Sequence, residues 1–251
     1  MTPNLLVLGG TTEASELASA LHARGVRGTY SYAGRVARPK RQPLATRVGG
    51  FGGVPGLVKW LSDNEISHVV DATHPFAAQM SQNAIAACDQ LGLPLAALTR
   101  PPWHPTTGDN WITVPDMDAA VQALAGDARR VMLAIGRMHL QDFTGLPQHF
   151  YLLRLIDAPT EPLSFPRHEV VIGQGPFSRD DDRALMQAHE IDLLVSKNAG
   201  GAAARAKIDA ARDLGIPVLM IERPVLPQRT QLFSVDAVLD WVDHGTTERG
   251  V

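Results

Sequence analysis

Residues 4–32 read NLLVLGGTTEASELASALHARGVRGTYSY, and this stretch decides the fold. The apolar run 4–8 predicts a buried strand that ends at Gly9 and Gly10. Apolar residues then recur at helical spacing, which predicts an amphipathic helix with one buried face: Ala14, Leu17, Ala18 and Leu21. A second strand is expected over 28–32. Together these elements form a βαβ unit, whose crossover length fits a parallel sheet.

Strands and helices continue to alternate through both halves of the chain. Further apolar runs predict strands at 46–48, 67–71, 93–98, 131–135, 150–156, 169–172, 191–196 and 217–221. Helical spacing predicts helices at 56–64, 77–91, 179–189, 202–214 and 235–242. The proline-rich passage 101–115 is expected to be a loop. We therefore expect an α/β protein with two Rossmann-like domains, 1–125 and 126–251, mostly parallel sheets, and an active site in the cleft between them.

An internal repeat supports two related domains. Residues 66–101 and 191–224 each contain a buried strand, a polar turn, an alanine-rich helix, Leu-Gly-x-Pro, a second strand and Arg-Pro. The turn 71–74 (Asp-Ala-Thr-His) and the turn 196–198 (Ser-Lys-Asn) fall at equivalent strand ends. Because open α/β sheets bind ligands at the carboxyl ends of their strands, both turns are expected to face one cleft.

Composition excludes several classes of protein. The chain has 251 residues, 45% hydrophobic and 20% charged, which excludes a disordered protein. No apolar run approaches the length that spans a bilayer, and the lone Cys88 excludes a disulfide framework. The nine histidines lack helical i, i+4 pairing, so no metal site is expected. With a net charge of −3, we expect a cytoplasmic enzyme that is monomeric and binds neither nucleic acid nor membranes.

The charges are unevenly distributed along the chain. No Asp or Glu occurs between Leu17 and Ser62. The same stretch contains eight basic residues: Arg24, Arg27, Arg35, Arg38, Lys40, Arg41, Arg47 and Lys59. This cationic segment predicts a phosphorylated or polycarboxylate ligand nearby, and the alternative is a solvated basic face.

The first glycine turn is the candidate phosphate loop of a dinucleotide site. It comprises Gly9, Gly10, Thr11, Thr12 and Glu13. Glycine lets the backbone approach a pyrophosphate, and the amides of the following helix N-terminus hold its charge. The alternative is a plain strand-to-helix turn with Thr12 as the N-cap. The acidic residue at position 13 has no functional explanation from sequence.

The end of the second strand indicates which nicotinamide cofactor binds. An NAD site has an acid there for the ribose 2′-hydroxyl, whereas an NADP site has a basic residue for the 2′-phosphate. Here Tyr32 is followed by Ala33, Gly34 and Arg35, so we expect NADPH to bind to the domain 1–125, with Arg35 at the phosphate.

Two further turns are candidate contacts of the cofactor. Gly49, Gly50 and Phe51 follow the third strand and suit close approach to a ribose or adenine, or are simply a flexible turn. Thr73 and His74 follow the fourth strand, where a dinucleotide fold places the nicotinamide ribose. A lone histidine in a turn also has a purely structural interpretation.

In the domain 126–251, polar and basic residues again follow expected strands. The candidate substrate-binding residues are Arg137, Ser178, Ser196, Lys197, Asn198, Gly200 and Gly201. A lysine at a strand end, followed by two glycines that open a helix, suits a site for anionic groups. Taken singly, each basic residue is equally consistent with a solvated surface position.

Five motifs resemble the precorrin-6A reductase family of cobalamin biosynthesis, in the right order over nearly the whole chain. They are LGGTTEASELA at 8–18, VGGFGG at 48–53, DATHPFAAQMSQNA at 71–84, GPFSRDDDRAL at 175–185 and LLVSKNAGG at 193–201. The resemblance implies NADPH-dependent reduction of a double bond in the precorrin-6A macrocycle, which gives precorrin-6B. It also implies two Rossmann-like domains that hold the tetrapyrrole between them. The cobalt-containing anaerobic counterparts share these motifs.

Such a reduction needs a hydride on one atom and a proton on its neighbour. The cofactor supplies the hydride, and Lys197 is the first candidate for a protein donor or electrostatic partner, with His74 second. A substrate with many carboxylates explains cationic turns in an acidic protein. Two other functions stay open from sequence: a reductase or dehydrogenase of a smaller anionic substrate, and a non-catalytic nucleotide-binding regulator.

Overall fold

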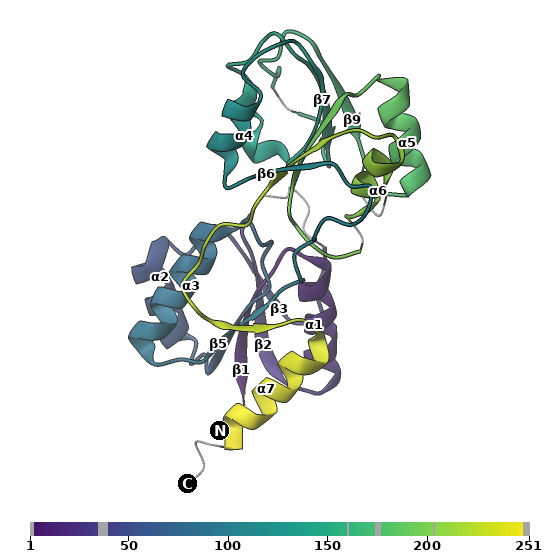
Figure 1. The fold of residues 1–251 in the computed structure, drawn as a ribbon. Coiled ribbons are helices and arrows are strands. Elements are labelled where there is room, and N and C mark those ends of the chain that lie inside the picture. Colours follow the sequence, from purple (N-terminus) through teal and green to yellow (C-terminus); the bar gives the residue numbers. More distant parts are fainter. Residues whose placement is uncertain (1–2, 35–39, 160, 174–176, 203, 248–251) are drawn as a thin grey trace. The chain divides into compact units, whose positions relative to one another are not determined.

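The computed structural model describes residues 3–34, 40–159, 161–173, 177–202 and 204–247. The chain divides into two compact units (Figure 1). Unit 1 comprises Met1–Arg100 and Val225–Val251, and unit 2 comprises Pro101–Pro224. The units therefore differ from the expected halves 1–125 and 126–251.

Unit 1 is built on a six-stranded sheet with the order β12-β5-β4-β1-β2-β3. Every neighbouring pair of its strands is parallel. The strands are β1 (Asn4–Leu8), β2 (Arg27–Tyr32), β3 (Ala45–Val48), β4 (His68–Asp71), β5 (Leu95–Leu98) and β12 (Thr230–Leu232). Because sequential strands run 3-2-1-4-5 before the last one joins, the order is that of a dinucleotide-binding fold.

Unit 2 repeats this arrangement with the order β6-β11-β10-β7-β8-β9, again all parallel. Its strands are β6 (Trp111–Val114), β7 (Arg130–Ala134), β8 (Phe150–Leu155), β9 (His168–Ile172), β10 (Leu193–Lys197) and β11 (Val218–Ile221). The two Rossmann-like parallel sheets expected from sequence are confirmed. The repeated segments also correspond, since β4 and β5 have the same places in their sheet as β10 and β11.

Helices cover the sheets because alternate strand residues are apolar on both faces. The helices are α1 (Thr12–Ala23), α2 (Gly53–Asp63), α3 (Ala78–Leu91), α4 (Met117–Ala123), α5 (Arg179–Ala188), α6 (Ala206–Asp213) and α7 (Val235–Thr247), with 3₁₀ turns η1 (Arg137–His139) and η2 (Gln141–Phe143). In unit 1, Leu5 and Val7 of β1 pack with α1 and α7, whereas Leu6 and Leu8 pack with α2 and α3. Among the described residues, no helix is long and apolar enough to cross a bilayer.

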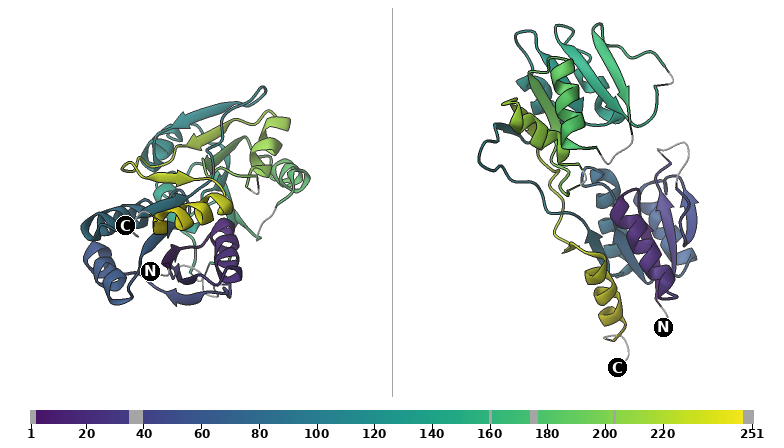
Figure 2. Two further views of the ribbon diagram at one scale, coloured as in Figure 1. Left: turned by 90° about the horizontal axis from the view of Figure 1, so that it is seen from below. Right: turned by 90° about the vertical axis from the view of Figure 1, so that its right-hand side faces the viewer.

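The units exchange their last strand and helix, which explains the unexpected boundaries. Strand β6 and helix α4 follow β5 along the chain, but β6 pairs with β11 of unit 2. Strand β12 and helix α7 follow β11, but β12 pairs with β5 of unit 1. Helix α7 packs against α1 of the same unit, as Figures 1 and 2 show. The sequence halves are thus the repeats, and each compact unit is completed by the end of the other half.

The exchange also corrects the expected loop at 101–115. Residues 111–114 form strand β6, which the surrounding prolines concealed in the sequence. The N-cap of α1 is Thr11 and not Thr12, so the helix begins one residue earlier than a turn capped by Thr12 would place it.

Candidate functional site

The glycine turn between β1 and α1 lies at the carboxyl end of β1, where the sequence leads us to expect a phosphate loop. Gly10 has φ +121°, a conformation that favours glycine, and its amide donates to the Tyr30 hydroxyl at 2.9 Å. A Cβ at Gly9 would lie 2.1 Å from the Tyr30 ring, so only glycine fits. Thr11 caps the helix by accepting from Ala14 N at 3.1 Å, and its hydroxyl donates to Ala72 O at 2.8 Å. The turn thus presents the N-terminus of a 12-residue helix at the carboxyl end of β1.

Glu13 in this first helical turn is neutralised within unit 1. Its Oε1 lies 3.2 Å from Nε of Arg100, and both side chains are largely buried. Arg100 is the last residue of unit 1 before the chain enters unit 2. The pair explains how an acid is tolerated in the first turn of α1, next to the candidate phosphate loop, because Arg100 matches its charge. Thr12, by contrast, is exposed in the same turn.

A second glycine turn lies at the carboxyl end of β3. Arg47 donates through Nη1 to Gly49 O at 2.9 Å and through Nη2 to Gly50 O at 3.0 Å. Its guanidinium also lies 3.7 Å from the centroid of the Phe51 ring. The glycine turn expected from the sequence is therefore held in one conformation by an arginine that sequence reasoning did not select.

The turn after β4 is organised by a buried carboxylate. Asp71 Oδ1 accepts from Thr73 Oγ1 at 2.6 Å and from Thr73 N at 3.2 Å. Its Oδ2 accepts from Ser81 Oγ at 2.6 Å and from Nη1 of Arg229, with which it forms an ion pair. Thr73 is therefore fixed at the strand end, which suits a residue that contacts a ligand.

His74 is exposed in the same turn. Its Nδ1 accepts from Phe76 N at 3.2 Å, and the two rings lie 5.8 Å apart. This local bond assigns one ring nitrogen to the turn and supports the structural interpretation of the histidine. The other nitrogen remains the candidate for contact with a ligand.

In unit 2, the turn after β10 is clamped from two sides. The Asn198 amide accepts from Trp103 N at 2.8 Å and donates to Trp103 O at 3.0 Å. Arg223 donates to Asn198 O at 2.9 Å and to Ala199 O at 3.0 Å. A Cβ at Gly200 would lie 2.2 Å from Pro101 O, so this position has no room for a side chain. The clamp fixes the backbone beside Lys197.

The structure places the expected substrate-binding residues in different environments. Ser196 and Asn198 are both buried, and the Asn198 amide is used within the unit. The Asn198 side chain bonds to the Trp103 backbone, and the Ser196 hydroxyl donates to Lys197 O at 3.3 Å. Both residues stay predicted contacts of the substrate. Lys197, the last residue of β10, is half-buried, and Gly201 accepts from the Trp103 indole through its carbonyl at 2.8 Å. Ser178 serves as the N-cap of α5 by accepting from Asp181 N.

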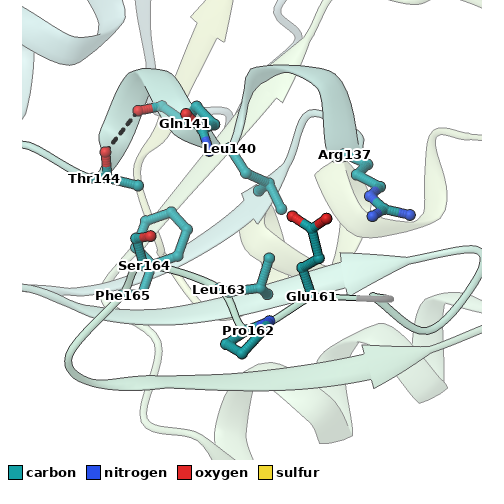
Figure 3. A pocket seen from close by; sticks show the side chains of 9 residues that line it. All are labelled: Arg137, Leu140, Gln141, Thr144, Glu161, Pro162, Leu163, Ser164 and Phe165. Carbon is teal, nitrogen blue, oxygen red and sulfur yellow. Dashed lines mark hydrogen bonds between the residues drawn. The ribbon is translucent and has the colours of Figure 1, made fainter.

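Arg137 lines a small pocket of about 120 Å³ next to the carboxyl end of β7. Figure 3 shows Arg137 and Glu161 at one end of the pocket and Thr144 and Ser164 at the other. Ordinary ligand sites have roughly 300–1,000 Å³. The pocket is therefore smaller than an ordinary ligand site.

Parallel strands place these residues on one edge of each sheet. The turns of unit 1 that follow β1, β3 and β4 share the carboxyl edge of its sheet, and the turns that follow β7, β9 and β10 share that of unit 2. Arg35 lies outside the described residues, as does Arg38. Within the described part of the chain, no group of three metal-binding side chains occurs.

Sequence reasoning missed the residues that hold these turns. They are Arg47, Asp71, Arg100, Trp103, Arg223 and Arg229. A signal was available for two of them, because Arg100 and Arg223 are the arginines of the repeated Arg-Pro. Trp103 and Arg229 contact residues that are 95 and 158 positions away, so spacing alone does not reveal them. Arg47 and Asp71 also have local partners, but their bonds follow no recognised motif.

Known proteins resemble this chain over almost its entire length. The family described as "Precorrin-6x reductase CbiJ/CobK" matches residues 4–243. Precorrin-6A reductase of Rhodobacter capsulatus is 54% identical over 248 residues, which cover 98% of this chain and 99% of the relative. A solved structure of CobK precorrin-6A reductase is 53% identical, covers 97% of each chain and gives a TM-score of 0.92.

A cobalt-precorrin-6A reductase is more distant. The protein of Salmonella typhimurium is 29% identical over 257 residues, which cover 94% of this chain and 92% of the relative. The two parallel sheets agree with the match to the solved CobK structure. The chain therefore belongs to the precorrin-6x reductase family CbiJ/CobK and is an oxidoreductase.

Proposed function

We propose that this protein uses NADPH to reduce a double bond of the precorrin-6A macrocycle, which gives precorrin-6B in cobalamin biosynthesis. The observation that carries the proposal is the family match over residues 4–243. The higher identity to a precorrin-6A reductase than to a cobalt-precorrin-6A reductase favours the cobalt-free substrate. A nicotinamide cofactor follows from the reductase family, and the 2′-phosphorylated form is the proposed one.

Unit 1 is the proposed cofactor unit, and its residues fit a dinucleotide. Gly9 and Gly10, whose own amides donate to Ser31 O and Tyr30 Oη, add no side chain to the turn. The backbone amides at the N-terminus of α1 are the proposed donors to the pyrophosphate. The absence of space for a side chain at Gly9 and the positive φ of Gly10 fit a backbone that a pyrophosphate approaches closely. When bound, the nicotinamide supplies the hydride. Thr73, fixed by Asp71, orients the ribose next to it.

Unit 2 is the proposed tetrapyrrole unit. Exposed apolar side chains stand at the carboxyl ends of three adjacent strands: Met138 after β7, Ile156 after β8 and Ile172 at the end of β9. Arg137 and Lys197 lie on the same edge. A carboxylate-rich macrocycle has apolar ring edges and anionic arms, and this edge offers a partner for each. The pocket at Arg137 accommodates one arm.

Lys197 is the proposed proton donor or electrostatic partner of the reduced ring, with His74 second. The clamp of Asn198 and Arg223 holds the backbone next to Lys197, so its ammonium is presented from a fixed strand end. The two candidates belong to different units, and a single cleft that contains both remains a prediction.

The test is a reduction assay with the purified protein and precorrin-6A. We expect NADPH oxidation only when precorrin-6A is present, a product heavier by two hydrogens, and much slower turnover with NADH. Oxidation that depends on a small anionic substrate instead would replace the proposal with a different reductase. Nucleotide binding without oxidation of NADPH by any tetrapyrrole would indicate a non-catalytic regulator.

A further inference from the structure

Each unit carries an arginine–phenylalanine stack, in which the phenylalanines have corresponding places and the arginines come from different strands, β3 for Arg47 and β8 for Arg154. In unit 1, the Arg47 guanidinium lies 3.7 Å from the centroid of the Phe51 ring. In unit 2, the Arg154 guanidinium lies 4.2 Å from the centroid of the Phe177 ring. Each phenylalanine stands directly before the N-cap of the helix that follows the third strand of its sheet, which is α2 or α5. The repeat therefore relates the two phenylalanines and their helices, while Arg154 stacks from the strand that corresponds to β2 and Arg47 from β3.

The stacks differ in what balances the charge of the arginine. Arg154 forms an ion pair with Asp182, the fourth residue of α5, which is 1% exposed. The fourth residue of α2 is Gly56, where a Cβ would lie 1.7 Å from Phe51 O. No carboxylate can occupy that position in unit 1. The chain also has no acid between Leu17 and Ser62.

Arg47 itself is a partly buried cation without a carboxylate partner among the described residues. Besides the two glycine carbonyls, it donates to Ser31 Oγ at 2.7 Å, so its bonds within the unit are all to neutral groups. Burial lowers its pKa, but a guanidinium stays charged in proteins. A partly desolvated charge that lacks a counterion favours the binding of an anion. After these bonds, Nε–H and one Nη2–H are left to donate.

The position of Arg47 indicates which anion binds. Its neighbour in the register of the parallel sheet is Ser31, at the carboxyl end of β2. In a dinucleotide fold, this end of the second strand lies at the ribose 2′ position, while the pyrophosphate lies at the turn after the first strand. Resting on the proposed function, we infer that Arg47 binds the 2′-phosphate of NADPH and sets the preference over NADH. Arg154 in unit 2 is already paired and takes no nucleotide phosphate.

The test compares adenosine 2′,5′-bisphosphate with adenosine 5′-monophosphate by calorimetry. The wild type is expected to bind the bisphosphate more tightly by roughly 10–150-fold, the range of a charge-assisted phosphate contact. Arg47→Gln is expected to remove most of that ratio and to leave the affinity for the monophosphate nearly unchanged. Arg27→Gln is the matched control, because Arg27 is an exposed arginine at the amino end of β2. It is expected to keep the full ratio.

The outcomes distinguish a wrong cofactor assignment from a wrong role for Arg47. Equal affinities of the wild type for both nucleotides would overturn the proposed NADPH dependence itself. A wild type that discriminates, with an unchanged ratio in Arg47→Gln, would overturn only the role of Arg47. A proportional loss for both nucleotides would also overturn it, since Arg47 would then merely support the glycine turn. If Arg47→Gln does not fold, Arg47→Lys is measured instead. It is expected to lose less affinity for the bisphosphate than Arg47→Gln would, and to keep its affinity for the monophosphate.

Discussion

Asp71 and Arg229 are 158 positions apart in sequence and form a buried ion pair at the carboxyl end of β4. Arg229 directly precedes β12, the strand that the second half of the chain contributes to unit 1. The same carboxylate accepts from Thr73 and Ser81. The late segment thus does more than complete the sheet, because it fixes a turn of the proposed cofactor site.

Removal of the cation from this pair is expected to destabilise unit 1 strongly. Arg229→Met leaves the Asp71 carboxylate buried without a counter-charge, which costs about 3–5 kcal/mol in comparable pairs. The measurement is the free energy of unfolding in urea. Lys59→Met is the control, because the exposed pair of Lys59 with Asp63 is worth about 0.3–0.5 kcal/mol. A loss below about 1 kcal/mol for Arg229→Met would show that the pair contributes little.

The exchanged C-terminal segment is expected to be essential for unit 1 and dispensable for unit 2. A chain that ends at Pro224 lacks β12 and α7, and so exposes the edge of β5. It also uncovers the α1 face that packs on Val238, Leu239 and Val242. Limited proteolysis is expected to degrade residues 1–100 rapidly and to leave 101–224 protected.

A chain that ends at Thr247 is the control, since it retains all of α7 and should resist proteolysis like the full-length protein. Equal protection of both units in the shorter chain would contradict the exchanged arrangement.

The lone cysteine is expected to be unreactive in the folded protein. Cys88 is buried in α3, and burial raises the pKa of its thiol to about 12, so the reactive thiolate is absent near pH 8. The stabilisation of the neutral thiol is present below the unfolded pKa near 9 and is lost as the pH rises through about 12.

A disulfide reagent at pH 8 measures this directly. It should label no thiol in the native protein and one thiol per chain after unfolding in guanidinium. Rapid complete labelling of the native protein would mean that unit 1 opens far more often than its packed core implies.

The sequence predicts the parts of the fold that depend on local patterns of residues. The apolar run of β1, the glycine turn and the helical spacing of α1 are sufficient for a βαβ unit, and the structure confirms them. Strands β6 and β12 escape this reasoning because they are short edge strands with few buried residues. Their partners lie in the other half of the chain, so only tertiary pairing identifies them.

The same distinction applies to the site. Residues in strand-end turns, such as Thr73 and Lys197, were selected because turn composition and position are visible in sequence. Residues that hold those turns, such as Arg47 and Asn198, are recognised only by their contacts. Asn198 belongs to both groups, because its strand-end position makes it a candidate from sequence, whereas its burial and its bonds to Trp103 are visible only in the structure.

Lys197 supplies the sharpest test of the chemistry. If its ammonium donates the proton, Lys197→Ala should lower kcat by about 10²–10⁴-fold and leave the affinity for NADPH unchanged. Lys197→Arg keeps the positive charge but is a much poorer acid, so it should restore KM for precorrin-6A without restoring kcat. Steady-state kinetics with NADPH binding measured separately checks both, and Lys59→Ala serves as an exposed control. A raised KM with unchanged kcat would reassign Lys197 to carboxylate binding, and unchanged values of both would remove it from the site.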